Sequence, residues 1–441
     1  PMPDTNGTNR KPPDKRNFMR EKIVKPPLPR RRLAARLAVL LILAAICGAV
    51  AGVSFVLAKG AASRLTGQET PDETTPISFT RDELEPSTEE STEPAGTESV
   101  LQDEKWVEEQ VAKAIAEHSF SAEDMASMYG ALRDLARRAD EKIVTVHSEK
   151  QRMDWFGNAV ENTDQAAGII IAKTPREILI FTSLASVSDN EAIEVVFNSG
   201  DSAPGIIRQT DQIMGVAVIS VETSALPAEK VNDLEPVELG NSYSVKQSDL
   251  VLAVGSPAGI VHSTNYGNIS YVAKNVQTTD GNTRVFYTDM VGNASVGTFI
   301  IDLEGKMIGW VTDDFKNENS QDMTAIYSIS DYKPQLERLT NGRSIAYFGV
   351  RGQEVSAAMI GQGMPAGIYV ADAVAGGPAY EAGIQNGDII TAIDGSAVRT
   401  SKELQTQLEN LESGQEITVK VRRQSREEYK ELEYHVNLRA R

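Results

Sequence analysis

The chain has 441 residues, of which 44 are Lys or Arg and 62 are Asp or Glu, giving a formal net charge of −18 at pH 7. This length suggests two or three domains, and an apolar content of 41% excludes global disorder. The acidic balance argues against nucleic acid as a partner, because binding it requires a basic surface. One cysteine excludes a disulfide framework. The sequence has no P-loop, dinucleotide fingerprint or metal-ligand cluster, so we expect no cofactor and no metal.

The N-terminal end combines a basic block with an apolar run. Residues 1–36 hold eleven Lys or Arg and three acids, and residues 37–58 are 22 residues without a charge. As an α-helix rising about 1.5 Å per residue, this run would extend about 33 Å, enough to cross a bilayer core. It exceeds the apolar region of about 7–15 residues of a signal peptide, which favours an uncleaved transmembrane helix over a cleaved signal or a buried helix. The positive-inside rule then makes residues 1–36 a cytoplasmic tail of a single-pass cell membrane protein, with everything from Lys59 onward extracytoplasmic.

Two further segments precede the first β-rich region. Residues 65–104 contain twelve acids and one arginine among Ser, Thr and Pro, so we predict that residues 59–104 form an acidic disordered stalk. Residues 105–140 show helical apolar periodicity, with Ser121 and Asp124 spaced as a capping box. One apolar stripe along this predicted helix indicates either a core face or an oligomer interface, which we call the seam. The stripe consists of Met125, Met128, Leu132 and Leu135.

Short runs of β-forming residues fill residues 141–342 and are separated by turn signals such as Asp280-Gly281-Asn282. So many short strands predict a β-barrel domain or a pair of barrels. The runs are IVTVHS, AAGIIIA, EILIFTS, AIEVVF, VAVISV, LVLAVGS, VFYTDM, TFIID and KMIGWVT.

Residues 343–441 have the pattern of a compact α+β module. Strands are predicted at YFGV, GIYVADAV, DIITAIDG, EITVKVRR and YKELEYHVNL. A helix is predicted from Lys402, with Thr400 and Glu403 as its capping box. The apolar face of this helix contains Leu404, Leu408 and Leu411.

The order of these parts resembles the HtrA/DegP family over roughly residues 141–439. The run AGGPAYEAGIQNGDIITAIDG at 375–395 resembles the family's PDZ motif. The runs LAVGSPAG at 252–259, YTD at 287–289 and GKMIG at 305–309 resemble its protease domain. The resemblance implies a mostly β fold, with a trypsin-like double β-barrel at 141–342 and an α+β PDZ domain at 343–441.

The resemblance also assigns the positions of a Ser-His-Asp triad. Ala185 falls where the family has its His, in IFTSLASV, and Gly215 falls where it has its Asp, in GVAVI. Ser295 is the candidate nucleophile, in a loop in which Asn293 and Thr298 replace a Gly and a Pro of the family motif. The backbone at Asn293 and Ser295 would form the oxyanion hole, which Asn293 weakens because the loop requires Gly-like freedom there. The nucleophile is therefore retained without the groups that move its proton.

Two substitutes for the missing base remain open on the sequence. His262 follows the LAVGSPAG run and is either a satisfied histidine or a relocated base. A Ser-Lys dyad would require a desolvated lysine beside Ser295, and Lys274 and Lys306 are the candidates.

A peptide-binding loop is expected at the start of the PDZ-like module, because its sequence resembles the family's loop for peptide C-termini. The loop consists of Tyr347, Phe348, Gly349 and Val350. Its backbone N–H groups would bind a terminal carboxylate while the peptide adds as a strand at the sheet edge. Leu404 and Leu408 either line the pocket for the last side chain or belong to the core. The expected ligands are peptides or unfolded proteins with free apolar C-termini.

These observations favour a membrane-anchored, extracytoplasmic HtrA-like pseudoprotease that binds peptides or unfolded proteins in envelope quality control. One alternative is an active serine endopeptidase with a non-standard base. Another is a scaffold whose PDZ domain docks a membrane partner. The resemblance further implies a possible homotrimer, assembled through the segment that precedes the barrels.

Overall fold

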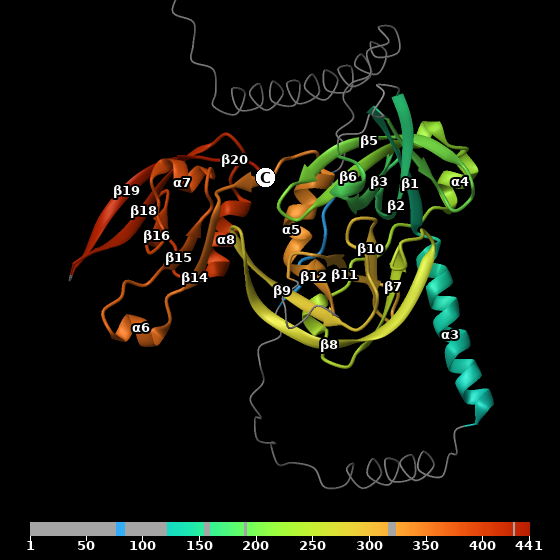
Figure 1. Cartoon of the computed structure of the whole chain (residues 1–441), viewed down its shortest axis with the longest axis horizontal. Coiled ribbons are helices and arrows are strands. Elements are labelled where there is room, and N and C mark those ends of the chain that lie inside the picture. The colour runs from blue at the N-terminus through green and yellow to red at the C-terminus, as the bar shows by residue number, and fades with distance from the viewer. Residues whose placement is uncertain (1–75, 84–120, 154–158, 189–191, 316–322, 427) are drawn as a thin grey trace, which may run out of the picture. The chain divides into compact units, whose positions relative to one another are not determined.

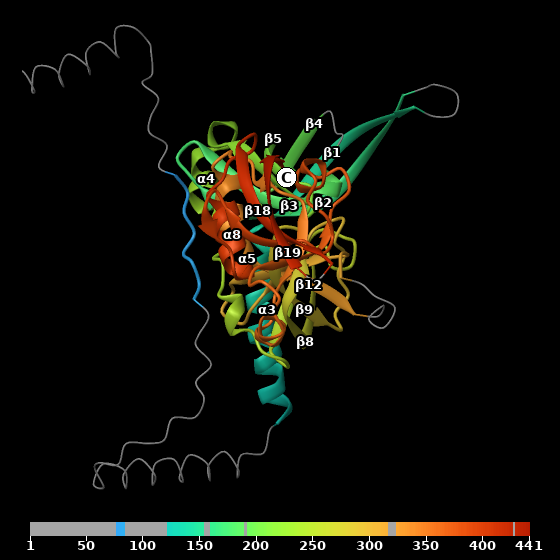
Figure 2. The same ribbon diagram turned by 90° about the vertical axis from the view of Figure 1, so that its left-hand side faces the viewer.

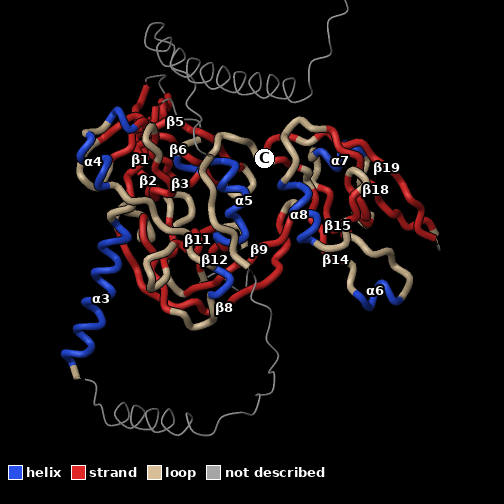
Figure 3. The backbone as a smooth tube through the Cα atoms, turned by 180° about the vertical axis from the view of Figure 1, so that it is seen from behind, coloured by secondary structure: helices blue, strands red, loops and turns tan. Residues whose placement is uncertain are grey.

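The computed structural model describes residues 76–83, 121–153, 159–188, 192–315, 323–426 and 428–441, which belong to one compact unit. The described residues are mostly β, with two closed six-stranded barrels and a separate sheet (Figure 1 and Figure 3). This confirms the predicted fold class for the folded part. The predicted tail (1–36) and transmembrane helix (37–58) lie outside the described residues. Among the residues that are described, no helix is long and apolar enough to cross a membrane.

The first barrel has the strand order β1-β2-β3-β6-β5-β4. Its strands are β1 (Ile143–Met153), β2 (Ala159–Lys173), β3 (Glu177–Ser183), β4 (Ala192–Val196), β5 (Ser202–Asp211) and β6 (Val216–Glu222). β3 and β6 are nearly continuous apolar runs because they pair with each other in the buried centre. β1 and β2 continue beyond the barrel as a two-stranded arm (Figure 2). Two short helical elements follow β3 and β6, namely η1 (Leu184–Ser186) and η2 (Thr223–Ala225).

The second barrel has the order β10-β11-β12-β9-β8-β7. Its strands are β7 (Leu250–Gly255), β8 (Ser263–Thr278), β9 (Gly281–Thr288), β10 (Thr298–Ile301), β11 (Met307–Thr312) and β12 (Thr324–Ser328). Between the barrels the chain forms α4 (Ala228–Asp233) and η3 (Ser242–Ser244). β8 and β9 form a hairpin in which Thr278 pairs with Gly281. The turn between them is therefore only Thr279 and Asp280, which places Asp280 at the tip.

The C-terminal module is a sheet in the order β14-β15-β16-β18-β19, with β14 at its edge. Its strands are β14 (Val350–Glu354), β15 (Ile368–Ala373), β16 (Ile389–Ile393), β17 (Ser396–Ala397), β18 (Glu416–Ser425) and β19 (Glu428–Asn437), with β13 (Ala346–Tyr347) paired to β20 (Arg439–Ala440). Its helices are α6 (Ala357–Gly361), α7 (Pro378–Ala382) and α8 (Ser401–Glu409). The predicted capping box of α8 is confirmed, since the Thr400 side chain accepts from the Glu403 N–H and the Glu403 side chain caps Thr400.

Helix α3 (Ala122–Asp140) begins at the predicted Ser121 and Asp124 capping box, which the structure confirms. Only its C-terminal end enters the core of this chain, through Leu135 and two alanines. Met125 and Met128 are each 53% exposed. The stripe is therefore not a core face at these two methionines.

One part of the predicted stalk (59–104) is docked on the folded protein. Residues 76–83, which we call the docked segment, run beside α5 (Ile329–Thr340). The main chain of Ile77 makes two hydrogen bonds with the Asn341 side chain, of 2.9 and 2.7 Å, and Ile77 and Phe79 pack against the main core. The prediction of a continuous disordered stalk is wrong for these eight residues, because their apolar side chains and one acid find partners on the protein.

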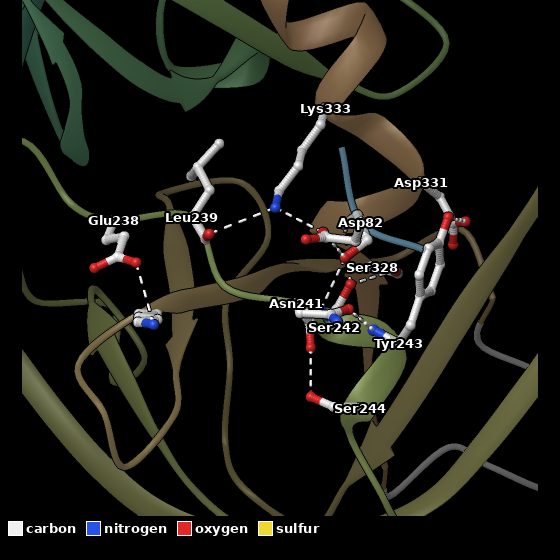
Figure 4. Close-up of polar contacts among 12 residues, drawn as sticks. Asp82, Glu238, Leu239, Asn241, Ser242, Tyr243, Ser244, Ser328, Asp331 and Lys333 are labelled. Atoms are coloured by element: carbon white, nitrogen blue, oxygen red, sulfur yellow. Dashed lines mark hydrogen bonds and ion pairs between the residues drawn. The ribbon is translucent and has the colours of Figure 1, made fainter. Parts of the chain in front are cut away.

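The acid of the docked segment is Asp82, which enters a buried polar network (Figure 4). Lys333 Nζ and Ser330 Oγ each donate to Asp82 Oδ2 over 2.6 Å. Ser330 is bonded in turn to Ser242, whose hydroxyl lies 2.7 Å from that of Ser328. A residue far away in the sequence thus neutralises a lysine of α5 that is only 2% exposed.

Candidate functional site

Three distant parts of the chain form one cleft of about 540 Å³, lined by residues of both barrels. Ala185 lies in η1 after β3, Gly215 in the turn before β6, and Ser295 in the loop before β10. All three line this cleft. The positions that the sequence assigned to a triad are therefore brought together.

The two triad positions beside Ser295 lack the groups that would move its proton, although the carboxylates of Asp313 and Asp314 also line the cleft. Ala185 offers only a methyl group, and Gly215 has no side chain and a φ of +62°. Of the described residues that line the cleft, none is a histidine or a lysine. Ser295 Oγ instead donates to Asn293 Oδ1 over 2.8 Å, and an amide oxygen is not a general base at neutral pH.

The candidate replacement bases lie outside the cleft that contains Ser295. His262 Nδ1 lies 3.0 Å from Asp140 Oδ1, and its Nε2 lies 3.3 Å from Thr145 Oγ1. The hydrogen bond to Asp140 raises the pKa of His262. Lys306 is paired with two glutamates, and Lys274 lines a separate depression.

The loop around Ser295 is closed, in the sense that its own side chains accept hydrogen bonds from its backbone N–H groups. The Asn293 N–H donates to Thr298 Oγ1 over 3.1 Å, and the Ser295 N–H donates to Asn293 Oδ1 over 3.1 Å. The Thr298 hydroxyl donates back to the Asn293 carbonyl over 3.0 Å. Both backbone donors that the resemblance assigns to the oxyanion hole are thus occupied. The Gly and Pro that stand at positions 293 and 298 in the family motif have no side-chain group that could accept these N–H groups.

The predicted peptide-binding loop has an occupant that sequence reasoning missed. The N–H groups of Phe348, Gly349 and Val350 all donate to the carboxylate of Asp280, at 2.9, 2.8 and 2.9 Å. Gly349 has a φ of +87°, so the loop does use the backbone freedom of glycine there. The sequence signal for Asp280 was only the Asp280-Gly281 turn, which marks a hairpin but not its target.

The sequence left two roles open for Leu404 and Leu408, as lining of the peptide pocket or as core residues. Their exposed fractions are 3% and 6%, and both pack in the core of the C-terminal module. Tyr347 is half-buried at the end of β13, where burial raises the pKa of its hydroxyl.

Comparison with known families supports both halves of this architecture. Residues 166–309 match a trypsin-like peptidase domain, and residues 338–436 match a PDZ domain. The chain is therefore a protein with a trypsin-like peptidase fold followed by a PDZ domain. These two matches, and the similar proteins below, support the HtrA/DegP-like family.

Similar proteins include the serine protease Do-like HtrA of Lactobacillus helveticus, 25% identical over 288 residues, which cover 61% of this chain and 68% of that protein. A probable periplasmic serine endoprotease, DegP-like, of Pseudomonas fulva is 28% identical over 279 residues, covering 61% of this chain and 55% of that one. The chain thus spans only part of the length of these relatives. Among solved structures, a variant of the HtrA-type protease AlgW with a decapeptide has the same fold, with a TM-score of 0.50 and 20% identity over 70% of this chain and 97% of that one.

Proposed function

We propose that this protein is a non-catalytic HtrA-like protein that binds peptides or unfolded proteins in quality control of the cell envelope. The observation that carries the proposal is the closed loop at Ser295, in which both backbone donors are occupied and the serine hydroxyl contacts an amide instead of a base. A serine without a base reacts orders of magnitude more slowly than a serine in an intact triad.

Peptide binding is supported by the PDZ domain and by the similar AlgW variant, whose structure was solved with a decapeptide. An extracytoplasmic location is supported by relatives described as periplasmic. The ligands we propose are unfolded proteins or peptides with a free apolar C-terminus.

The test of the catalytic part is hydrolysis of unfolded casein together with labelling by a fluorophosphonate. We expect neither cleavage nor labelling of Ser295, and no difference between the wild type and Ser295→Ala. Trypsin serves as the positive control in the same assay. Casein cleavage that Ser295→Ala abolishes would show that the protein is an active protease.

We further propose a layout in which residues 37–58 anchor the chain, residues 1–36 stay in the cytoplasm and residues 59–75 link the anchor to the docked segment. The apolar run and the basic block before it support this layout. Protease added outside intact cells is expected to remove the folded part and leave the N-terminal tail protected. Native protein found soluble and uncut would contradict the anchor.

A homotrimer is proposed through α3, because its N-terminal half exposes Met125, Met128 and Tyr129. The chain from residue 101 onward is expected to sediment as a trimer, and the double variant Met125→Gln/Met128→Gln as a monomer. Ile206→Gln, which replaces another exposed apolar residue, is the matched control. A monomeric wild type at high concentration would rule this seam out.

A further inference from the structure

The tip of the β8–β9 hairpin presents a carboxylate to the PDZ domain, as the C-terminus of a peptide would. Asp280 Oδ1 accepts the N–H groups of Gly349 and Val350, and Asp280 Oδ2 accepts that of Phe348. Three converging backbone donors in a glycine-containing turn form a concave anion site. Here the anion is a side chain of the second barrel, and it is buried with the loop that holds it.

The main chain of the tip also behaves as a bound strand. The Asp280 N–H donates to the Val350 carbonyl over 2.7 Å, at the free edge of β14, and Arg351 Nε contacts Thr279 Oγ1 at 3.3 Å. Added strands bind sheet edges through such main-chain bonds. On the other side, a Cβ built on Gly281 would lie 3.3 Å from Gln405 of α8. The tip therefore lies between β14 and α8.

Arg441, which is not part of the Tyr347–Val350 loop, also holds the tip of the β8–β9 hairpin in place. Its Nη2 donates to the Thr279 carbonyl over 2.7 Å, and its Nε lies 3.7 Å from Asp211 Oδ1. Burial raises the pKa of Asp280, whereas Arg441 and the three backbone donors act in the opposite direction. A buried carboxylate persists only when it is paired and hydrogen-bonded in this way.

We propose that the β8–β9 hairpin is the built-in ligand of the PDZ domain, with the Asp280 carboxylate in the place of a peptide's terminal carboxylate. A peptide with a free C-terminus then binds only after the hairpin leaves the groove. The apparent affinity of such a peptide is lowered by the fraction of molecules in which the groove is empty. This inference rests on the proposed peptide binding for its ligand class, but the occupied loop can be tested without any peptide.

The first measurement is hydrogen exchange of the amides of residues 348–350 in the full-length chain. The amides are expected to be protected in the wild type and to exchange at least tenfold faster in Asp280→Ala. Asp280→Asn retains the size and an acceptor oxygen but loses the charge, so we expect an intermediate rate. Asp233→Ala removes an exposed carboxylate of α4 and is expected to change nothing.

The second measurement is binding of a labelled decapeptide that ends in Val with a free carboxylate, and of the same peptide amidated at its C-terminus. The free peptide is expected to bind Asp280→Ala at least tenfold more tightly than the wild type. Gly349→Val in the Asp280→Ala background should abolish this gain, because position 349 has a positive φ.

The outcomes separate this inference from the proposed function. Equal loop exchange in the wild type and both Asp280 variants would overturn the built-in ligand, whatever the peptides do. Faster exchange in Asp280→Ala without any gain in binding would retain the built-in ligand and instead contradict peptide capture by this groove. Faster exchange together with tighter binding of only the free carboxylate supports both.

Discussion

Asp82→Ala is expected to destabilise the folded chain by about 3–5 kcal/mol, because it leaves the buried ammonium group of Lys333 without its counter-charge. The Lys333 side chain is 3% exposed and that of Asp82 is 11% exposed, so solvent screens this pair little. Lys333 Nζ also contacts the Leu239 carbonyl, but over a longer distance of 3.5 Å. The docked segment thus stabilises the protease-like part although it lies far away in the sequence.

The measurement is urea unfolding of the full-length chain, with Glu83→Ala as a control that removes the neighbouring exposed carboxylate. Lys333→Met should recover most of the loss in the Asp82→Ala background, because replacing both partners removes the unpaired charge. A free energy of unfolding within about 0.5 kcal/mol of the wild type, the range of ordinary surface substitutions, would show that Lys333 finds another partner without Asp82.

Each of the nine β runs read from the protease-like sequence lies wholly or largely in a strand, whereas β5, β8 and β12 were missed. β5 contains Pro204 and Gly205, which usually interrupt strands. The structure shows why a glycine stands there, since a Cβ at position 205 would lie 2.8 Å from the Ile219 side chain. β8 is long and partly exposed, so it lacks the apolar runs that mark buried strands. Such features arise from tertiary packing, which local sequence patterns do not contain.

The site was predictable to the extent that it depends on the order of motifs along the chain. That order placed Ala185, Gly215 and Ser295, which the structure brings into one cleft. The closure of the loop depends on which side chain accepts which backbone N–H, and residue identity does not determine that. The pairing of Asp280 with the PDZ loop joins residues 68 to 70 positions apart, and no local pattern could indicate it.

Restoring the missing triad residues is expected to be insufficient for hydrolysis. In Ala185→His/Gly215→Asp, the Asn293 and Thr298 side chains still occupy the two backbone donors of the oxyanion hole. Losing a single oxyanion donor costs about 100- to 1000-fold in rate. Adding Asn293→Gly and Thr298→Pro removes both internal acceptors, so this fourfold variant should exceed the double variant by at least about 100-fold in kcat/KM.

The assay is cleavage of unfolded casein by the double and fourfold variants, with Ser295→Ala in the fourfold background as the control that must abolish it. The backbone at position 215 has a positive φ, which aspartate tolerates better than most residues, so Gly215→Asp is a feasible substitution. Asn293→Gly/Thr298→Pro alone should remain inactive, because opening the hole supplies no base. If the double variant cleaves casein as fast as the fourfold variant, the loop opens readily around substrate. The loss of activity would then come from the missing His and Asp alone.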